Sequence, residues 1–164
     1  MQTYDAIIIG GGPSGSTCAT ELVKGGIPTL LLDRATFPRV KLCGGWISEP
    51  IWEVLGLSPG EYTGGLWKWK KLYIHLHGKK YIKKASGYFV RRVEFDDFLL
   101  KRSKVEVKEG YMASHFEKDP EGYWVINNEY RSKYLIGAGG SHCPVARALF
   151  PKPDNLQFGT QERE

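Results

Sequence analysis

The sequence predicts a fold of the α/β class, with a parallel β-sheet, helices and an inserted β-hairpin. Three observations lead to this prediction. An apolar strand pattern at residues 4–9 is followed by a helical pattern, and a second apolar strand pattern follows at residues 28–33. Residues 69–90 instead alternate between polar and apolar side chains around Gly78, which is typical of an antiparallel hairpin. Alternating strands and helices favour a parallel sheet, to which the hairpin adds extra β structure.

The length and composition of the chain fit one globular domain. The chain has 164 residues, of which 41% are hydrophobic and 25% are charged, close to the averages of globular proteins. A chain of this size can bury roughly two thirds of its unfolded surface. We therefore expect residues 1–164 to form a single domain, with the hairpin inserted at about residues 66–90.

The N-terminal segment is expected to form a strand, a helix and a second strand. Isoleucines dominate residues 4–9, as in a buried parallel strand. Pro13 suits the first turn of the helix, and Gly25 and Gly26 end it. The connection in such a unit is nearly always right-handed, so the two strands are parallel and their carboxyl ends lie at one edge of the sheet. Ligands of open α/β sheets bind along that edge.

The elements expected beyond residue 34 are less regular. Residues 35–45 contain proline and glycine and are expected to form a loop. A short helix should begin at about Ser48, whose hydroxyl can cap it, and Trp46 should fill the core. Apolar periodicity predicts a helix over residues 93–103. Short strands and a final helix are expected at residues 105–110, 111–119, 123–127, 134–138 and 143–150.

Three glycines after the first strand have the spacing GxGxxG. Gly10 permits a tight turn, Gly12 lets a pyrophosphate approach the backbone, and Gly15 lets the helix pack closely on the strand. The first helical turn presents free N–H groups to phosphates, and Ser14 can contact a phosphate or cap the helix. Asp33 ends the second strand and can accept hydrogen bonds from ribose hydroxyls. The segment therefore predicts a dinucleotide site for NAD, NADP or FAD.

The cysteine and histidine content argues against disulfides and metal sites. The three cysteines, Cys18, Cys43 and Cys143, are odd in number and lack CxxC spacing, which favours a reducing, cytoplasmic compartment. His75 and His77 could share one face of a strand, but two ligands do not make a metal site. No apolar run approaches the ~18 residues of a membrane span.

The basic charge of the chain is concentrated in one region. Residues 66–104 contain twelve lysines or arginines and three acidic residues, whereas the remainder contains eleven and fifteen. Lysines interleaved with aromatic side chains suit an anionic membrane or nucleic acid, and a solvated sheet face is the alternative. We expect no nucleic-acid partner and leave a peripheral membrane contact open.

Four motifs, in order along the chain, together resemble one family of flavoproteins. They are the glycine motif with Asp33, KLCGG at residues 41–45, RRVEFDDFLLKRS at residues 91–103 and YLIGAGGSHCPVAR at residues 134–147. On these motifs the chain resembles FAD-dependent oxidoreductases of the geranylgeranyl reductase family, in the hydroxybenzoate-hydroxylase-like branch. The resemblance implies a Rossmann-like FAD-binding domain. It covers the N-terminal part of the family, so the chain is expected to be truncated.

The resemblance also implies which residues bind FAD and which take part in catalysis. Arg92 matches an arginine that reaches the FAD in the pattern R-x-x-F-D-x-x-L, and the loop of Cys43 lies by the isoalloxazine. The family's alkene reduction makes the Cys43 thiol a proton donor, whereas the plain alternative is a buried cysteine that packs like a small hydrophobe. The implied FAD-binding residues are Gly10, Gly12, Pro13, Ser14, Gly15, Asp33, Arg34, Lys41, Cys43, Gly44, Gly45, Arg92 and Gly139.

A parent protein of this kind would use FAD to reduce carbon–carbon double bonds of an isoprenoid or similar lipid. Its electron donor would be NAD(P)H or reduced ferredoxin, and it would work in the cytoplasm or at a membrane surface. Relatives often carry Ala-Asp-Gly where this chain has Ala138, Gly139 and Gly140, and the missing carboxylate argues against direct reduction by NADPH. Two alternatives stay open: a flavin-dependent monooxygenase of the same fold, and a non-catalytic nucleotide-binding module.

Overall fold

The computed structural model describes residues 1–150 and contains two sheets. The larger sheet has six strands in the order β6-β2-β1-β9-β8-β7. Its parallel part pairs β1 with β2 and β9, and β2 with β6, whereas β7, β8 and β9 pair in antiparallel fashion. The strands are β1 (Gln2–Ile9), β2 (Thr29–Leu32), β6 (Glu106–Lys108), β7 (Phe116–Lys118), β8 (Trp124–Ile126) and β9 (Tyr130–Gly137).

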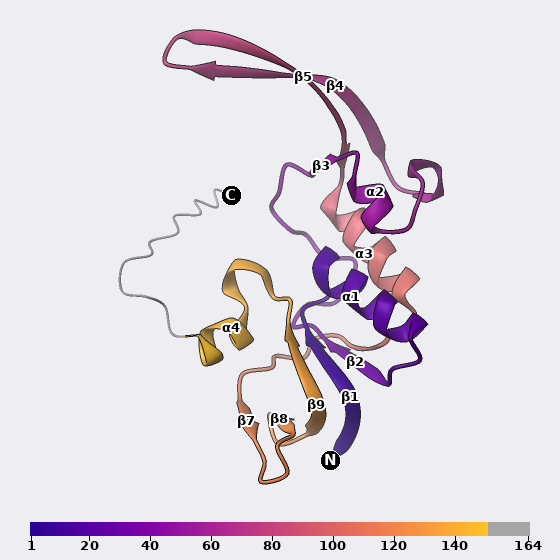
Figure 1. Cartoon of the computed structure of the whole chain (residues 1–164), viewed down its shortest axis with the longest axis vertical. Helices are drawn as coiled ribbons and strands as arrows, with labels where there is room; N and C mark the ends of the chain where they lie inside the picture. The colour runs from indigo at the N-terminus through magenta and orange to yellow at the C-terminus, as the bar shows by residue number, and fades with distance from the viewer. Residues whose placement is uncertain (151–164) are drawn as a thin grey trace.

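The smaller sheet is antiparallel and carries the inserted hairpin. Its strand order is β3-β5-β4, with β3 at Trp46–Ser48, β4 at Leu66–Leu76 and β5 at Lys79–Val90. β3 pairs only with the body-proximal end of β5, so the outer part of the β4–β5 hairpin is a two-stranded ribbon. Figure 1 shows this ribbon projecting away from the rest of the molecule.

The helices join the two sheets into one body. Helix α1 (Pro13–Lys24) connects β1 to β2 and packs beside α3 (Arg92–Ser103), which follows the hairpin (Figure 1). The remaining helical segments are α2 (Ile51–Val54), α4 (Pro144–Leu149) and the 3₁₀ turns at Pro59–Glu61 and Gly140–His142. Among residues 1–150 we find no helix with the length and apolar character that a bilayer crossing requires.

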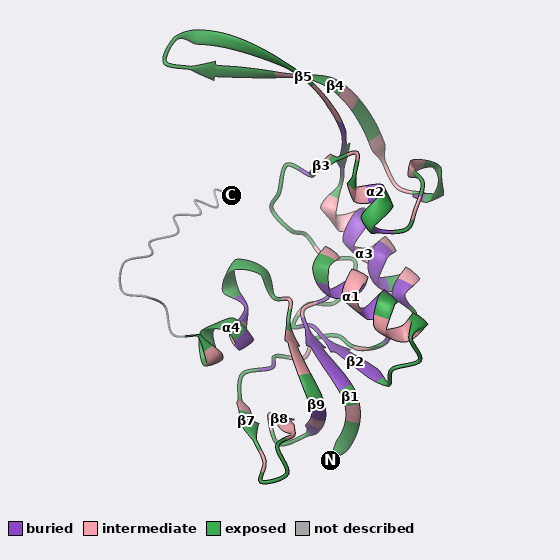
Figure 2. Ribbon diagram, viewed as in Figure 1, coloured by how far each residue is buried: buried purple, intermediate pink, exposed green. Residues whose placement is uncertain are grey.

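Three apolar clusters hold these elements together, and Figure 2 shows the buried strands at the centre of the larger sheet. One cluster joins Ile8 and Leu31 to Ala19 of α1 and Leu100 of α3. A second lies on the opposite face of the sheet and includes Val145 of α4. The third fills the space between α2, α3 and the smaller sheet with the side chains of Trp52, Leu55, Tyr62, Tyr88, Val90, Phe95 and Leu99.

The expected α/β class, the parallel sheet and the hairpin are confirmed, and three local expectations are wrong. The helix expected from Ser48 begins at Ile51, because residues 46–48 pair with β5 and form a strand. Trp46 is 55% exposed instead of filling the core. Of the strand expected at residues 111–119, only β7 forms, since its pairing with β8 begins at Phe116. Residues 151–164, the last part of the expected domain, lie outside the described residues.

Candidate functional site

The glycine loop between β1 and α1 has a conformation that side chains would prevent. Gly10 has φ +115°, and a Cβ there would lie 2.6 Å from the carbonyl oxygen of Ala138 at the end of β9. A Cβ at Gly15 would collide with the carbonyl oxygen of Gly10. Both glycines therefore allow the start of α1 to lie against the carboxyl ends of β1 and β9. Gly139, which follows Ala138 just after β9, is exposed.

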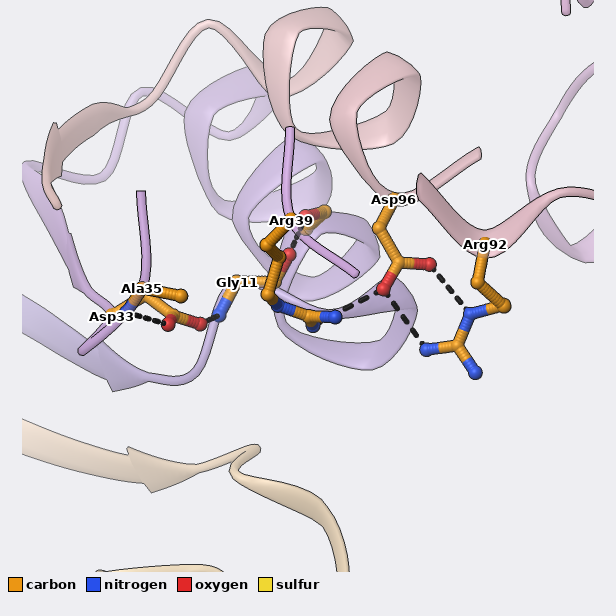
Figure 3. A network of polar contacts seen from close by, with 7 residues as sticks. Gly11, Asp33, Ala35, Arg39, Arg92 and Asp96 are labelled. Atoms are coloured by element: carbon orange, nitrogen blue, oxygen red, sulfur yellow. Dashed lines mark hydrogen bonds and ion pairs between the residues drawn. The ribbon is translucent and has the colours of Figure 1, made fainter. Parts of the chain in front are cut away.

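Asp33 connects the end of β2 to the glycine loop. Its carboxylate accepts hydrogen bonds from the backbone N–H groups of Gly11, at 2.6 Å, and Ala35, at 2.8 Å (Figure 3). The side chain lies in a largely buried position at the sheet edge. A carboxylate oxygen has more than one acceptor position, so these bonds leave capacity for a ligand hydroxyl. The next residue, Arg34, is exposed.

The first turn of α1 is open toward a ligand. Its N-cap residue is Gly12, and no side chain caps the helix. A Cβ at Gly12 would have only the Arg39 guanidinium within 4 Å, at 3.6 Å. Ser14 is exposed, whereas the Ser16 hydroxyl donates internally to the carbonyl oxygen of Gly11. Free N–H groups and the positive end of the helix dipole are therefore available to an anion beside Arg39.

A buried carboxylate holds two arginines next to this helix end. Asp96 of α3 is fully buried and accepts two hydrogen bonds from Arg92, at 2.7 and 2.9 Å. The same carboxylate lies 3.1 Å from Nη2 of Arg39, which comes from the loop after β2 (Figure 3). The buried Nη1 of Arg39 has no hydrogen-bond partner among the described residues. The cluster therefore presents a fixed guanidinium with an unused donor beside the glycine loop.

Sequence reasoning selected Arg92 and missed Arg39. The burial of Asp96, which makes it the shared partner of both arginines, does not follow from the sequence pattern. The sequence feature that could have identified Arg39 is its position, because it is a positively charged residue between the second expected strand at residues 28–33 and the KLCGG motif at residues 41–45.

Cys43 is exposed and chemically activated by its neighbours. The backbone N–H of Gly45 donates to its sulfur at 3.4 Å. This hydrogen bond lowers the pKa of the Cys43 thiol below its ordinary value, and the nearby Arg92 guanidinium adds to the effect. Gly45 itself has φ +65°, and a Cβ there would collide with the carbonyl oxygen of Val90. The glycine is thus required by the fold and also places an N–H at the sulfur.

A cavity of about 330 Å³ lies beside Cys43. It is bounded by the first turns of α1, by the segment after Cys43, by α2 and by α3. Its lining is mainly apolar, with Arg92 and two thiols as the reactive groups. The lining residues are Pro13, Ser14, Thr17, Cys18, Cys43, Gly45, Trp46, Ile47, Ile51, Val54, Leu55, Arg92 and Phe95.

The expected site residues thus fall into two adjoining groups. The glycine loop, Asp33 and Gly139 lie at the carboxyl edge of the larger sheet, while Cys43 and Gly45 line the cavity. Pro13 and Ser14 of the first turn of α1 line the cavity too, and Arg92 reaches from the cavity to the arginine cluster. Lys41 and Gly44 are exposed in the connecting loop.

The activated state of Cys43 predicts a difference in thiol reactivity. Iodoacetamide should modify Cys43 at least severalfold faster than Cys18 at neutral pH, because burial raises the pKa of the Cys18 thiol while that of Cys43 is lowered. Replacing Arg92 with methionine should shift the pH dependence of Cys43 alkylation upward. Peptide mass spectrometry over a pH series measures both rates. Equal pH profiles in the two proteins would show that Arg92 does not act on the thiol.

Curated proteins similar to this chain include isoprenoid-lipid reductases and a halogenase. No family model matches the chain. A digeranylgeranylglycerophospholipid reductase of Methanococcus vannielii is 32% identical over 145 residues, which cover 82% of this chain and 36% of the reductase. A tryptophan 2-halogenase of Chondromyces crocatus is 32% identical over 127 residues, covering 70% of this chain and 24% of the halogenase. The first relatives are thus more than twice as long as this chain.

Solved structures agree with these relatives. The geranylgeranyl bacteriochlorophyll reductase-like protein of Thermoplasma acidophilum matches with a TM-score of 0.70 and 25% identity, over 85% of this chain and 40% of that protein. The halogenase PltM, solved with phloroglucinol and FAD, has the same fold at a TM-score of 0.73 and 20% identity, over 89% of this chain and 36% of PltM. The resemblance to geranylgeranyl reductases is therefore confirmed, and the solved neighbours include FAD-dependent halogenases.

Proposed function

We propose that this chain is the FAD-binding part of a flavin-dependent reductase that hydrogenates carbon–carbon double bonds of an isoprenoid lipid. The observation that carries the proposal is the junction of the open glycine loop with the Cys43 cavity. Arg92 lines the cavity and pairs with Asp96, the carboxylate that also holds Arg39 beside Gly12, so a nucleotide held at the sheet edge would extend toward the Cys43 thiol. The reductase relatives and their solved neighbour support this assignment.

The residues at the sheet edge fit the adenosine and pyrophosphate parts of FAD. The space beside Gly12 and the unpartnered Nη1 of Arg39 are the two observations that test the fit. Asp33 would accept bonds from ribose hydroxyls, and its charge would disfavour a ribose 2′-phosphate. The first turn of α1 and Arg39 would hold the pyrophosphate, with Arg92 alongside. Arg34, Lys41, Gly44 and Gly139 complete the proposed set.

Bound FAD, once reduced by the electron donor, would supply the hydride, and the role of this chain would be to supply a proton at the correct place. The Cys43 thiol would donate its proton to the substrate carbon next to the one that accepts hydride. Because the Gly45 N–H and Arg92 stabilise the thiolate, the thiol is a stronger acid than an ordinary cysteine. The apolar lining beside it would exclude water from that carbon.

The partners of the whole protein are part of the same proposal. An isoprenoid-type lipid is the substrate, and NAD(P)H or reduced ferredoxin is the electron donor. The chain has Ala138, Gly139 and Gly140 where relatives often carry Ala-Asp-Gly, which argues against direct reduction by NADPH. A cytoplasmic location and a single domain over residues 1–164 stay predictions.

The first test is whether the chain retains FAD and then supports reduction. We expect this chain alone to bind FAD weakly, and the flavin absorption band that is left after mixing with FAD and removal of unbound dye measures how much is retained. With a chemical reductant and a geranylgeranyl lipid, mass spectrometry should detect the addition of one hydrogen molecule per reduced double bond. Cys43→Ala should lower this product roughly 100-fold while FAD remains bound, a typical contribution of a general acid.

Three other outcomes are distinguishable in the same experiment. A colourless protein that binds ADP would be a nucleotide-binding module. An FAD-loaded protein that hydrogenates no isoprenoid or quinone acceptor would contradict the reductase proposal. The halogenase relative favours a monooxygenase-type reaction as second candidate, and a stable flavin hydroperoxide after addition of oxygen would support it.

A further inference from the structure

The outer part of the hairpin, residues 70–84, is a two-stranded ribbon without a core of its own. Every side chain in it is exposed except the half-buried Leu72. Figure 2 shows the ribbon as an exposed arm that leaves the body beyond β3. An isolated two-stranded hairpin in water is marginally stable, and contact with another surface would stabilise it. We call this segment the distal hairpin.

The pairing of the two strands gives the distal hairpin two unlike faces. Directly opposed residues share a face, and neighbours along a strand point to opposite faces. The apolar face consists of the opposed pairs Leu72 and Lys83, Ile74 and Tyr81, and Leu76 and Lys79. The basic face consists of the opposed pairs Lys71 and Lys84, Tyr73 and Ile82, and His75 and Lys80. The cation–π contact of Lys80 with Tyr73, at 4.8 Å, confirms that these two share a face.

The charge of the distal hairpin is entirely positive. Residues 70–84 contain six lysines and no acidic residue. Two of these lysines, Lys79 and Lys83, lie among the apolar side chains of the apolar face. Long lysine side chains can reach past apolar neighbours to place their ammonium groups at the level of phosphates. Three exposed apolar side chains and the half-buried Leu72, with lysines beside them, are the pattern of a segment that lies in the headgroup layer of a bilayer.

We propose that the distal hairpin docks this protein on an anionic lipid bilayer, with the apolar face directed toward the lipids. Leu72, Ile74, Leu76 and Tyr81 enter the headgroup region, and Lys79 and Lys83 on the same face contact lipid phosphates. The charge complementarity between six lysines and an anionic surface selects this occupant. The proposal concerns a surface outside the Cys43 cavity and does not depend on any redox activity.

Two other occupants explain the distal hairpin less well. Single-stranded nucleic acid gains from stacking on aromatic rings, but three of the four apolar side chains of the apolar face are aliphatic. Pairing with the edge of a second copy would bring lysine-bearing strands together, and lysines on edge strands oppose such association. An anionic bilayer can contact both the aliphatic side chains and the lysines at the same time.

Vesicle sedimentation with the whole chain tests the proposal. We expect binding to vesicles that mix phosphatidylglycerol with phosphatidylcholine, weak binding to phosphatidylcholine alone, and release at high salt. The double variant Ile74→Ser and Tyr81→Ser should weaken binding about tenfold or more, because it removes apolar area from the bilayer contact. The matched variant Tyr73→Ser and Ile82→Ser removes the same two residue types from the basic face and should stay within a factor of about two.

Vesicle sedimentation measures membrane binding independently of flavin binding and reduction. All variants should retain the circular dichroism spectrum and the nucleotide binding of the parent chain, because the distal hairpin lies outside the three apolar clusters. The proposal fails if anionic vesicles do not sediment the chain, if neutral vesicles bind equally well, or if both double variants lose binding equally. Binding of a single-stranded oligonucleotide without vesicle binding would make the distal hairpin a nucleic-acid surface instead.

Discussion

An Asp96→Ala variant is expected to lose about 3–5 kcal/mol of unfolding free energy, the usual loss when one partner of a buried ion pair is removed. The Asp96 carboxylate is fully buried and pairs with both Arg92 and Arg39. The side chains of these arginines are only 19% and 18% exposed, so the variant leaves two largely buried guanidinium groups without their counter-charge. Urea unfolding followed by circular dichroism measures the change.

The neighbouring aspartate provides the matched control for this prediction. Asp97 pairs with Lys101 at 2.7 Å, and the Lys101 side chain is 74% exposed. The Asp97 side chain is 18% exposed, but its loss leaves behind only the solvated Lys101 ammonium, so Asp97→Ala should change the unfolding free energy by less than about 1 kcal/mol. Similar losses in both variants would mean that the shared carboxylate does not organise the arginine cluster. An Asp96→Asn variant, which keeps the volume, should fall between the two.

The arginine cluster contains one contact that the sequence predicts and one that it does not. The spacing of Arg92 and Asp96 is one helical turn, so their contact follows from the helix that the sequence predicts. The contact of Asp96 with Arg39 joins residues 57 positions apart and depends on how the loop after β2 crosses α3. No local pattern encodes such a contact, and the burial of Asp96 was therefore missed.

The other expectations were likewise correct where the pattern is local in the sequence and wrong where the structure depends on residues far apart in the chain. The strand-helix-strand unit around Gly10 was predictable because its apolar period and its glycine spacing are both local. The strand at residues 46–48 was not, because it exists through pairing with β5, far along the chain. The alternation in residues 69–90 predicted the hairpin correctly. It did not predict that both faces of the distal hairpin would be exposed, since burial depends on what packs against a strand.

The second large expected effect concerns the glycine loop, where two substitutions should distinguish an effect on stability from an effect on ligand binding. Gly15→Ala should cost about 2–3 kcal/mol of unfolding free energy, because the added Cβ would collide with the Gly10 carbonyl and the backbone must move. The same shift should abolish binding of ADP and FAD, since it moves the first turn of α1 away from the loop. Chemical unfolding and isothermal titration with ADP measure the two effects.

Gly12→Ala is the informative comparison, because its methyl group meets almost nothing in the folded chain. Gly12 has φ −70°, which alanine adopts freely, and its nearest contact would be Arg39 at 3.6 Å. The variant should stay within about 1 kcal/mol of the parent in stability, as surface substitutions do, and yet bind ADP at least about tenfold more weakly, because the methyl group occupies the approach of the pyrophosphate. Unchanged ADP affinity in Gly12→Ala would place the phosphates away from the start of α1. A combined loss of stability and affinity would instead mean that Gly12, like Gly15, is required by the fold alone.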